Sequence, residues 1–271
     1  MDNQNSTPVL VIGVMNRCGT NFLAHLLRIT GQFEIPSPAC EGYMSFYSDM
    51  IVDYASNITK HWSGGSPEKA EEICAKIGQT LVEYLAELQE DRDKRLLLKT
   101  PRSRGLHNVP KLFPSAKVLI LLRDGRDVCE SAERSFVRES RRWWRKEWIR
   151  RWNEGAQCIL EFMSTCENER GRSWELVKYE ELVNNLRTEL GKALSLLGVS
   201  PASYPWQDAE AAPVIGSSGT GSTQEGLNWK PKQKDDSFNS VGRWQNSWGY
   251  LRRRQFNRIA GDNMKRLGYA D

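Results

Sequence analysis

Short apolar runs alternate with longer amphipathic stretches along the chain, and this alternation predicts the fold. The runs are nearly continuous, which is typical of strands covered on both faces of a parallel sheet. They lie at residues 9–15, 95–100, 117–123 and 174–179. Between them apolar residues recur at helical spacing, which predicts helices over 20–29, 68–90, 127–136, 134–152 and 184–198. Strands that alternate with helices indicate an α/β fold with a central parallel sheet.

The C-terminal third of the chain departs from this regular pattern. Residues 216–244 are rich in Gly, Ser and Lys and have no clean period, and an irregular stretch of that length is typical of a functional or disordered segment. A terminal helix follows, with an apolar side predicted to contain Trp248, Leu251, Phe256, Ile259, Met264 and Leu267. Neither an internal repeat nor a domain boundary interrupts the chain, so we expect one domain over residues 1–271.

The segment "NRCGTNF" at 16–22 joins the first predicted strand to the first predicted helix. Backbone N–H groups at a helix N-terminus attract an oxyanion, and Gly19 lets the backbone approach one closely. Arg17 adds a guanidinium whose forked donors fit phosphate or sulfate. Gly19 is followed by Thr20 and Asn21 and not by the Lys-Ser/Thr pair of nucleotide hydrolases. Alone, the loop is equally compatible with a plain turn capped by Thr20.

A second polar motif, "LLRDGRDVCES" at 121–131, follows another predicted strand. It places Arg123 and Ser131 near the carboxyl end of that strand. Ligands of open parallel sheets bind at this edge. The two motifs together therefore predict an anion site that joins distant parts of the chain.

With both motifs present, the sequence resembles the sulfotransferases that depend on 3′-phosphoadenosine-5′-phosphosulfate (PAPS). "NRCGTNF" is similar to the family's 5′-phosphosulfate loop and "LLRDGRDVCES" to its 3′-phosphate motif. The stretch 177–198 resembles the family's Tyr strand with its following helix, and 242–269 resembles its C-terminal helix ending in Gly-Tyr. The resemblance spans 9–269. It implies a three-layer, P-loop-like fold with a central parallel sheet flanked by helices, forming a single sulfotransferase domain.

The resemblance also implies which residues bind PAPS and its product PAP (3′-phosphoadenosine-5′-phosphate). They are Arg17, Cys18, Gly19, Thr20 and Asn21 at the 5′ side, Arg123 and Ser131 at the 3′-phosphate, Tyr179 near the adenosine, and Ser217 and Ser218 at the phosphosulfate. Arg17 and Lys99 are the expected catalytic cations, which would neutralise the leaving phosphate without a metal. Cys18 stands where the family usually has serine; it is either a small residue that fits or a site of oxidation.

The acceptor hydroxyl needs a general base, and the sequence offers two candidates. The animal cytosolic members use a histidine in K-T-H-L-P, but "KTPRS" has Pro101 at that position. Glu41 follows Arg17 by 24 residues, a placement similar to the catalytic glutamate of the Golgi tyrosine-sulfating members, and it is the expected base. His107 is the second candidate. Glu41 as an ordinary surface carboxylate is the alternative to a catalytic role.

Charge and composition limit the classes of partner and the cellular location expected for this protein. The net charge of +4 is too small to indicate a nucleic-acid binder. Six cysteines without C-x-x-C pairs indicate reduced thiols. With no signal-peptide pattern and no apolar run long enough to span a membrane, a cytoplasmic protein is expected. The expected acceptor is a hydroxyl of a carbohydrate, glycoside or small metabolite; the sequence does not indicate an oligomeric state.

The segment 134–152 contains eight Arg or Lys and two Glu, with Trp144, Trp148 and Trp152 spaced four apart. Such a stripe is typical of a core-facing helix with a solvated basic face, although part of that face could line the acceptor cleft. Two other functions remain open from the sequence: a small-molecule kinase with a divergent phosphate loop, and a non-enzymatic binder of anionic surfaces.

Overall fold

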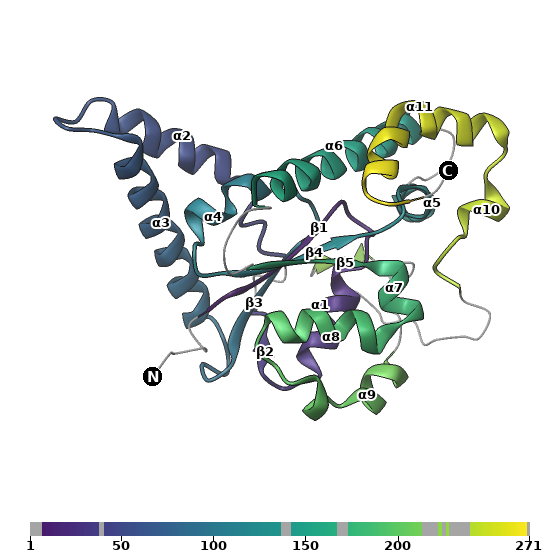
Figure 1. Ribbon diagram of the computed structural model, residues 1–271, viewed down its shortest axis with the longest axis horizontal. Coiled ribbons are helices and arrows are strands. Elements are labelled where there is room, and N and C mark those ends of the chain that lie inside the picture. The colour runs from purple at the N-terminus through teal and green to yellow at the C-terminus, as the bar shows by residue number, and fades with distance from the viewer. Residues whose placement is uncertain are drawn as a thin grey trace.

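The computed structural model describes residues 7–37, 41–136, 142–166, 173–212, 222–223, 226–227 and 239–269. Its main sheet has five parallel strands in the order β2-β3-β1-β4-β5 (Figure 1). The strands are β1 (Val9–Gly13), β2 (Phe33–Glu34), β3 (Arg95–Thr100), β4 (Lys117–Leu122) and β5 (Trp174–Lys178). A separate antiparallel pair joins β6 (Ser222–Thr223) to β7 (Gly226–Leu227). The four predicted strands are confirmed, whereas β2 was missed because two residues show no period.

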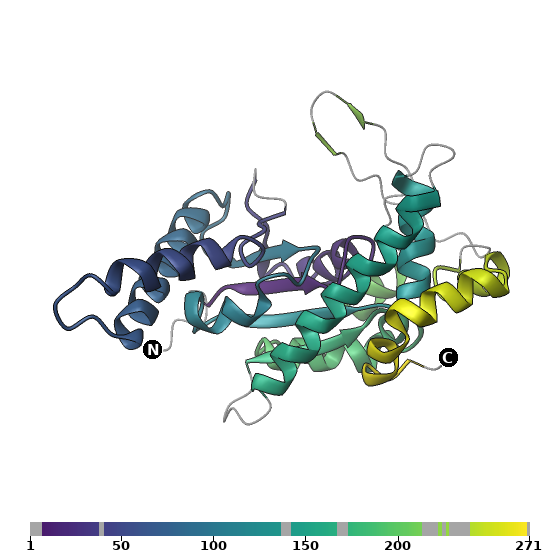
Figure 2. The same ribbon diagram turned by 90° about the horizontal axis from the view of Figure 1, so that it is seen from above.

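Helices cover both faces of the sheet, which confirms the three-layer α/β arrangement. In Figure 1, α6 and α11 lie on one side and α1 and α8 on the other, and Figure 2 shows α11 beside α6. The helices are α1 (Thr20–Arg28), α2 (Ser48–Thr59), α3 (Pro67–Glu87), α4 (Val109–Leu112), α5 (Gly125–Phe136), α6 (Arg142–Cys166), α7 (Tyr179–Asn184), α8 (Leu186–Leu196), α9 (Trp206–Ala211), α10 (Trp244–Ser247) and α11 (Tyr250–Arg266). Two 3-10 turns, η2 (Leu106–Asn108) and η3 (Pro201–Ser203), complete the set.

The core lies where these layers meet the central strands. Every residue of β1, β3 and the last five positions of β4 is buried. This explains the near-continuous apolar runs in the sequence, since both faces of a central parallel strand are covered. Among the described helices, α1 buries Phe22, Leu23, Leu26 and Leu27 against the sheet side of the fold.

The predicted helix over 134–152 is wrong as a single element. Its residues are divided between α5 and α6, which pack against each other. A Cβ added to Gly125 at the start of α5 would lie 2.6 Å from the ring of Trp152 in α6. The missing side chain of Gly125 therefore permits the close approach of α6 to α5.

Two other predicted helices need smaller corrections. The stretch 184–198 contains the end of α7 and all of α8, and Gly198, with φ of 71°, ends α8 as predicted. Phe256, Met264, Trp248 and Leu267 are buried as expected of the terminal helix. Leu251 was wrongly assigned to its buried side, because it is 78% exposed.

Candidate functional site

The carboxyl edge of the parallel sheet brings the predicted site residues into one region. Val11 of β1 pairs with Lys99 of β3, and Gly13 pairs with Leu121 of β4. The chain leaves these strands at residues 16–19 after β1, which form the predicted phosphate-binding loop, at Lys99 and Thr100 of β3, at Arg123 after β4 and at Tyr179 after β5. The neighbouring strands β1 and β4 thus supply the two predicted motifs, and β3 on the other side of β1 supplies Lys99, as at the switch points where ligands bind in open α/β sheets.

Gly19 shapes the turn from β1 into α1. Its φ of +104° lies in the region that favours glycine. An added Cβ would lie 2.5 Å from Cδ2 of the buried Tyr179 ring. Thr20 is buried and Asn21 half-buried at the first turn of α1, whose N-terminal N–H groups have no partners within the helix. The Tyr179 ring therefore packs against this turn, and the N-terminus of α1 begins directly after it.

Cys18 differs from the other predicted loop residues because its side chain is completely buried. A Cβ added to Gly13 would lie 2.4 Å from the Cys18 Sγ, so the thiol occupies the space above that glycine. Burial raises the pKa of the thiol to about 11, which keeps it protonated and unreactive at neutral pH. Its backbone N–H donates to the carbonyl of Met15 (3.2 Å). The structure gives the Cys18 side chain a packing role, in agreement with the interpretation as a small residue that fits.

Arg17, Arg123 and Ser131 meet in space although they are distant in the sequence. Nε of Arg17 donates to Oγ of Ser131 (3.2 Å), and Nη1 of Arg123 donates to the Arg17 carbonyl (2.8 Å). Burial, followed by the positive charge of Arg123, lowers the pKa of Arg17 to about 10. Arg17 remains a cation at neutral pH. The two predicted motifs therefore form one buried, positively charged site.

Arg123 is held from three sides. Its Nη2 donates to the carbonyl of Ser240 (2.5 Å), and its guanidinium lies 4.4 Å from the centroid of the Tyr179 ring. The Tyr179 hydroxyl in turn donates to Oγ of Ser240 (3.0 Å). Nε of Arg123 is buried and has no hydrogen-bond partner among the described residues. A buried guanidinium N–H of this kind is suited to an anionic ligand, because leaving a donor unsatisfied is costly.

Arg243, just before α10, is a further cation that the sequence reasoning missed. Burial lowers its pKa, and the charges of Arg134 and Arg123 lower it further. Its charge also contributes to the lowered pKa of Arg17. In the sequence, its role was indicated only by its position in the segment 242–269, which resembles the C-terminal helix of the sulfotransferases. Arg17, Arg123 and Arg243 therefore converge as three mutually repelling cations, which we call the arginine cluster.

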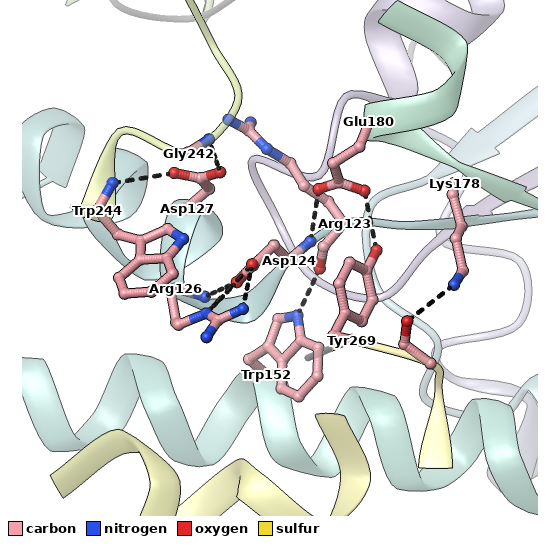
Figure 3. Close-up of polar contacts among 11 residues, drawn as sticks. Arg123, Asp124, Arg126, Asp127, Trp152, Lys178, Glu180, Gly242, Trp244 and Tyr269 are labelled. Atoms are coloured by element: carbon pink, nitrogen blue, oxygen red, sulfur yellow. Dashed lines mark hydrogen bonds and ion pairs between the residues drawn. The ribbon is translucent and has the colours of Figure 1, made fainter. Parts of the chain in front are cut away.

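Buried polar contacts fix the backbone next to Arg123 (Figure 3). The Asp124 N–H and the Tyr269 hydroxyl both donate to Glu180, at 2.8 and 2.9 Å. Burial raises the pKa of Glu180. Nε1 of Trp152 donates to the Arg123 carbonyl (3.1 Å). These partners come from α7, α6 and the C-terminus, so sequence spacing alone does not reveal them.

Asp127 anchors the segment that carries Ser240 and Arg243. Its carboxylate accepts hydrogen bonds from the backbone N–H groups of Gly242 (2.7 Å) and Trp244 (3.2 Å), as Figure 3 shows. Burial raises the Asp127 pKa despite the opposing charge of Arg123. The second aspartate of the "RDGRD" motif is therefore a structural link between α5 and the C-terminal segment.

Lys99 and Glu41 form an ion pair at the edge of this region. Nζ of Lys99 lies 3.5 Å from Oε1 of Glu41, and both side chains are largely buried. The Tyr43 hydroxyl donates to Oε2 of Glu41 (3.0 Å), and the Gly42 N–H donates to the Lys99 carbonyl (3.0 Å). Glu41 is therefore not the ordinary surface carboxylate of the alternative interpretation.

His107, the second candidate base, has a different environment. It lies on η2 with its side chain 57% exposed, and Nε2 is 3.5 Å from Oδ1 of Asp49 on α2. This places it in a surface pair with Asp49. Ser217 and Ser218 lie outside the described residues.

A match to a known protein family shows which family this chain belongs to. A model described as "Sulfotransferase family" matches residues 8–203, more than half of the chain. This chain belongs to the sulfotransferase family. No curated protein sequence matches it significantly.

Solved structures agree with the fold of this sulfotransferase. The sulfotransferase domain of the Synechococcus PCC 7002 olefin synthase matches with a TM-score of 0.59 and 19% identity, over 100% of this chain and 98% of that one. A sulfotransferase from Alicyclobacillus acidocaldarius matches with a TM-score of 0.53 and 15% identity, covering 96% and 94%. A mouse sulfotransferase complexed with PAP matches with a TM-score of 0.54 and 14% identity, covering 96% and 84%. At these identities the likeness establishes the P-loop-like α/β fold alone.

Two tryptophans of the predicted stripe belong to the core of this sulfotransferase. Trp148 and Trp152 are buried, as the core interpretation predicts; the Trp144 side chain lies outside the described part. Across the ranges that the structure describes, no group of three or more His, Cys, Asp or Glu side chains could hold a metal. None of the described helices is both long enough and apolar enough to cross a membrane.

Proposed function

We propose that this sulfotransferase moves the sulfuryl group of PAPS to an acceptor hydroxyl. The observation that carries the proposal is the contact of Arg17 with Ser131, 114 residues apart, inside the arginine cluster. Cations gathered in a partly buried site are costly unless an anion lies between them. A nucleotide with phosphates at both its 3′ and 5′ positions supplies two such groups.

The residues present fit the donor nucleotide. The buried Nε of Arg123 and the Ser131 hydroxyl would hold the 3′-phosphate, and the N-terminus of α1 at Gly19, Thr20 and Asn21 would hold the 5′ side. Tyr179 supports both parts, because it packs against Gly19 and lies against Arg123. The similarity to a mouse sulfotransferase complexed with PAP gives further support.

PAPS, when bound, supplies the sulfuryl group and the leaving phosphate. In the proposed transfer the acceptor oxygen bonds to sulfur, the bond from sulfur to the phosphate oxygen breaks, and the acceptor proton passes to Glu41. Among the described residues, each oxygen of the Glu41 carboxylate has one partner, Lys99 or Tyr43, and keeps a lone pair for an acceptor hydroxyl. Arg17 and Lys99 supply fixed positive charge for the leaving phosphate. Loss of one such donor typically costs about 10²–10³ in rate.

A carbohydrate, glycoside or other small hydroxylated molecule is the proposed acceptor. The divergent-kinase alternative is disfavoured by membership of the sulfotransferase family. The anionic-surface alternative loses the support of the tryptophans at 148 and 152, because they pack in the core. A cytoplasmic location stays a prediction from the sequence.

Glu41→Gln tests the assignment of the base. We expect this variant to bind PAP within about threefold of the wild type and to lose about 10²–10⁴ of its turnover with labelled PAPS, the range of general-base catalysis. His107→Ala is the matched control and should keep both properties. Wild-type turnover in Glu41→Gln, or a selective loss in His107→Ala, would show that Glu41 is not the base. No labelled product from the wild type across a broad acceptor panel, together with no PAP binding, would refute the proposed reaction itself.

A further inference from the structure

Arg102 lies three residues beyond Lys99, on the segment that leaves the carboxyl end of β3. Its half-buried side chain is fixed by two contacts. Nε donates to Oδ1 of Asn16 (2.7 Å), and the guanidinium carbon lies 5.5 Å from the centroid of the Phe46 ring. Asn16 directly precedes Arg17 in the phosphate-binding loop. Arg102 therefore lies beside the proposed reaction centre, and its contacts with Asn16 and Phe46 fix the position of its side chain.

A short chain of contacts connects Arg102 to the proposed base. The Asn16 side chain, which accepts from Arg102, also interacts with the Tyr43 hydroxyl, and that hydroxyl donates to Glu41. Burial and then the charge of Glu41 raise the pKa of Tyr43, whereas the positive charge of Arg102 opposes this rise. Arg102 is thus close enough to act on the group that holds Glu41, and a ligand on its guanidinium would lie near the acceptor hydroxyl.

The outer end of the Arg102 guanidinium is available to a ligand. Within the described residues its Nη1 and Nη2 make no hydrogen bond and no carboxylate pairs with its charge. Arg104 stacks on the same Phe46 ring at 5.2 Å but extends toward Asp49, with Nε 3.8 Å from Oδ2. Two neighbouring arginines therefore have different environments. The parallel Nη donors of Arg102 are suited to bidentate contact with an acidic group.

Aromatic rings continue the surface beside Arg102. The Phe46 ring contacts Tyr43 and Tyr47 edge to face, with centroids 5.8 and 4.9 Å away. Tyr47 is 61% exposed, and Met50 and Tyr54 continue this exposed side along α2 at helical spacing. Such rings offer a flat apolar face for a sugar or aromatic ring. Cationic and aromatic groups next to Glu41 together favour an acceptor with both a ring and an acid group.

We propose that the acceptor is a hydroxylated ring compound that carries an anionic group, and that Arg102 binds this group while the hydroxyl faces Glu41. The inference rests on the proposed sulfuryl transfer and specifies its acceptor. Arg102 acts here as a specificity-determining residue.

Matched acceptor pairs test the inference. Each pair shares a ring and its hydroxyls and differs in one carboxylate: 4-nitrophenyl β-glucuronide against the β-xyloside, and 4-hydroxybenzoate against 4-hydroxybenzamide. We expect the wild type to prefer the acid member of at least one pair by about tenfold or more in kcat/KM, the range of a charge-assisted hydrogen bond. Arg102→Gln should abolish the preference by lowering kcat/KM for the acid alone, Arg102→Lys should restore part of it, and Arg104→Gln should retain it.

Other outcomes would show which part of the inference is wrong. Equal wild-type rates for both members of every pair, or no product from any acid member, would overturn the inference. An equal loss on acid and neutral acceptors in Arg102→Gln would show that Arg102 only supports Asn16, and equal losses in the Arg102 and Arg104 variants would indicate a general surface charge. PAP binding is measured for each variant and should not change. Failure of the wild type to bind PAP would instead count against the proposed function.

Discussion

Gly19→Ala perturbs the phosphate-binding loop at its tightest contact. The left-handed backbone of Gly19 costs an alanine about 1–2 kcal/mol, and the reduced freedom of the unfolded chain returns about 0.4–1 kcal/mol. The new Cβ would also lie 2.5 Å from the buried Tyr179 ring, and overpacking of this kind costs about 1–3 kcal/mol. We therefore expect the free energy of unfolding to fall by about 1–5 kcal/mol.

Gly31→Ala is the matched control at the other end of α1. Gly31 also has a positive φ, of 73°, but an added Cβ there has no neighbour within 4 Å. It should lose at most about 1.5 kcal/mol, so the difference between the variants measures the collision with Tyr179. Displacement of Tyr179 also disturbs Arg123, and PAP affinity should fall at least about tenfold in Gly19→Ala alone. Equal unfolding energies by urea denaturation, with equal PAP affinities by calorimetry, would refute this reasoning.

Two further predictions concern buried titratable groups. Iodoacetamide applied to the native protein should modify the half-buried Cys158 well before Cys18, whose thiol is completely buried with a raised pKa; mass-mapped labelling of Cys18 first would contradict its packing role. Burial raises the pKa of Glu180 above its ordinary 4.5, so the folded state binds this proton more tightly and the carboxylate costs stability at neutral pH. Relative to Glu180→Gln, the wild type should therefore gain stability as pH falls from 7 toward 4.5 in urea unfolding, and a relative loss would reverse the assigned sign.

The sheet and the meeting of the two polar motifs were predictable because both follow from local sequence patterns. Continuous apolar runs identify central parallel strands, and the polar residues after β1 and β4 necessarily reach the same edge. The contact between Arg17 and Ser131 follows from this topology. Gly198 was also recognisable, because a glycine after a helical pattern commonly ends a helix.

The features that could not be predicted from the sequence depend on tertiary packing. Arg243 reaches the arginine cluster because Asp127 holds the N–H groups of its neighbours. The division of 134–152 into two helices depends on the approach of Trp152 to Gly125. The exposed position of Leu251 likewise depends on which side of α11 packs against its neighbours. Helical spacing alone does not show whether a given apolar residue is buried or exposed.

Thermal unfolding with a series of nucleotides tests the central claim most directly. PAP, AMP, and ATP with Mg²⁺ are compared in EDTA-treated protein, since PAP and AMP differ only in the 3′-phosphate assigned to Arg123 and Ser131. At about 100 times its Kd, PAP should stabilise the fold by about 2.7 kcal/mol without a metal, and AMP at the same concentration should stabilise it much less. Arg123→Gln should remove the difference between the two. A response only to ATP with Mg²⁺, or equal responses to PAP and AMP, would contradict a site built for a 3′-phosphorylated sulfuryl donor.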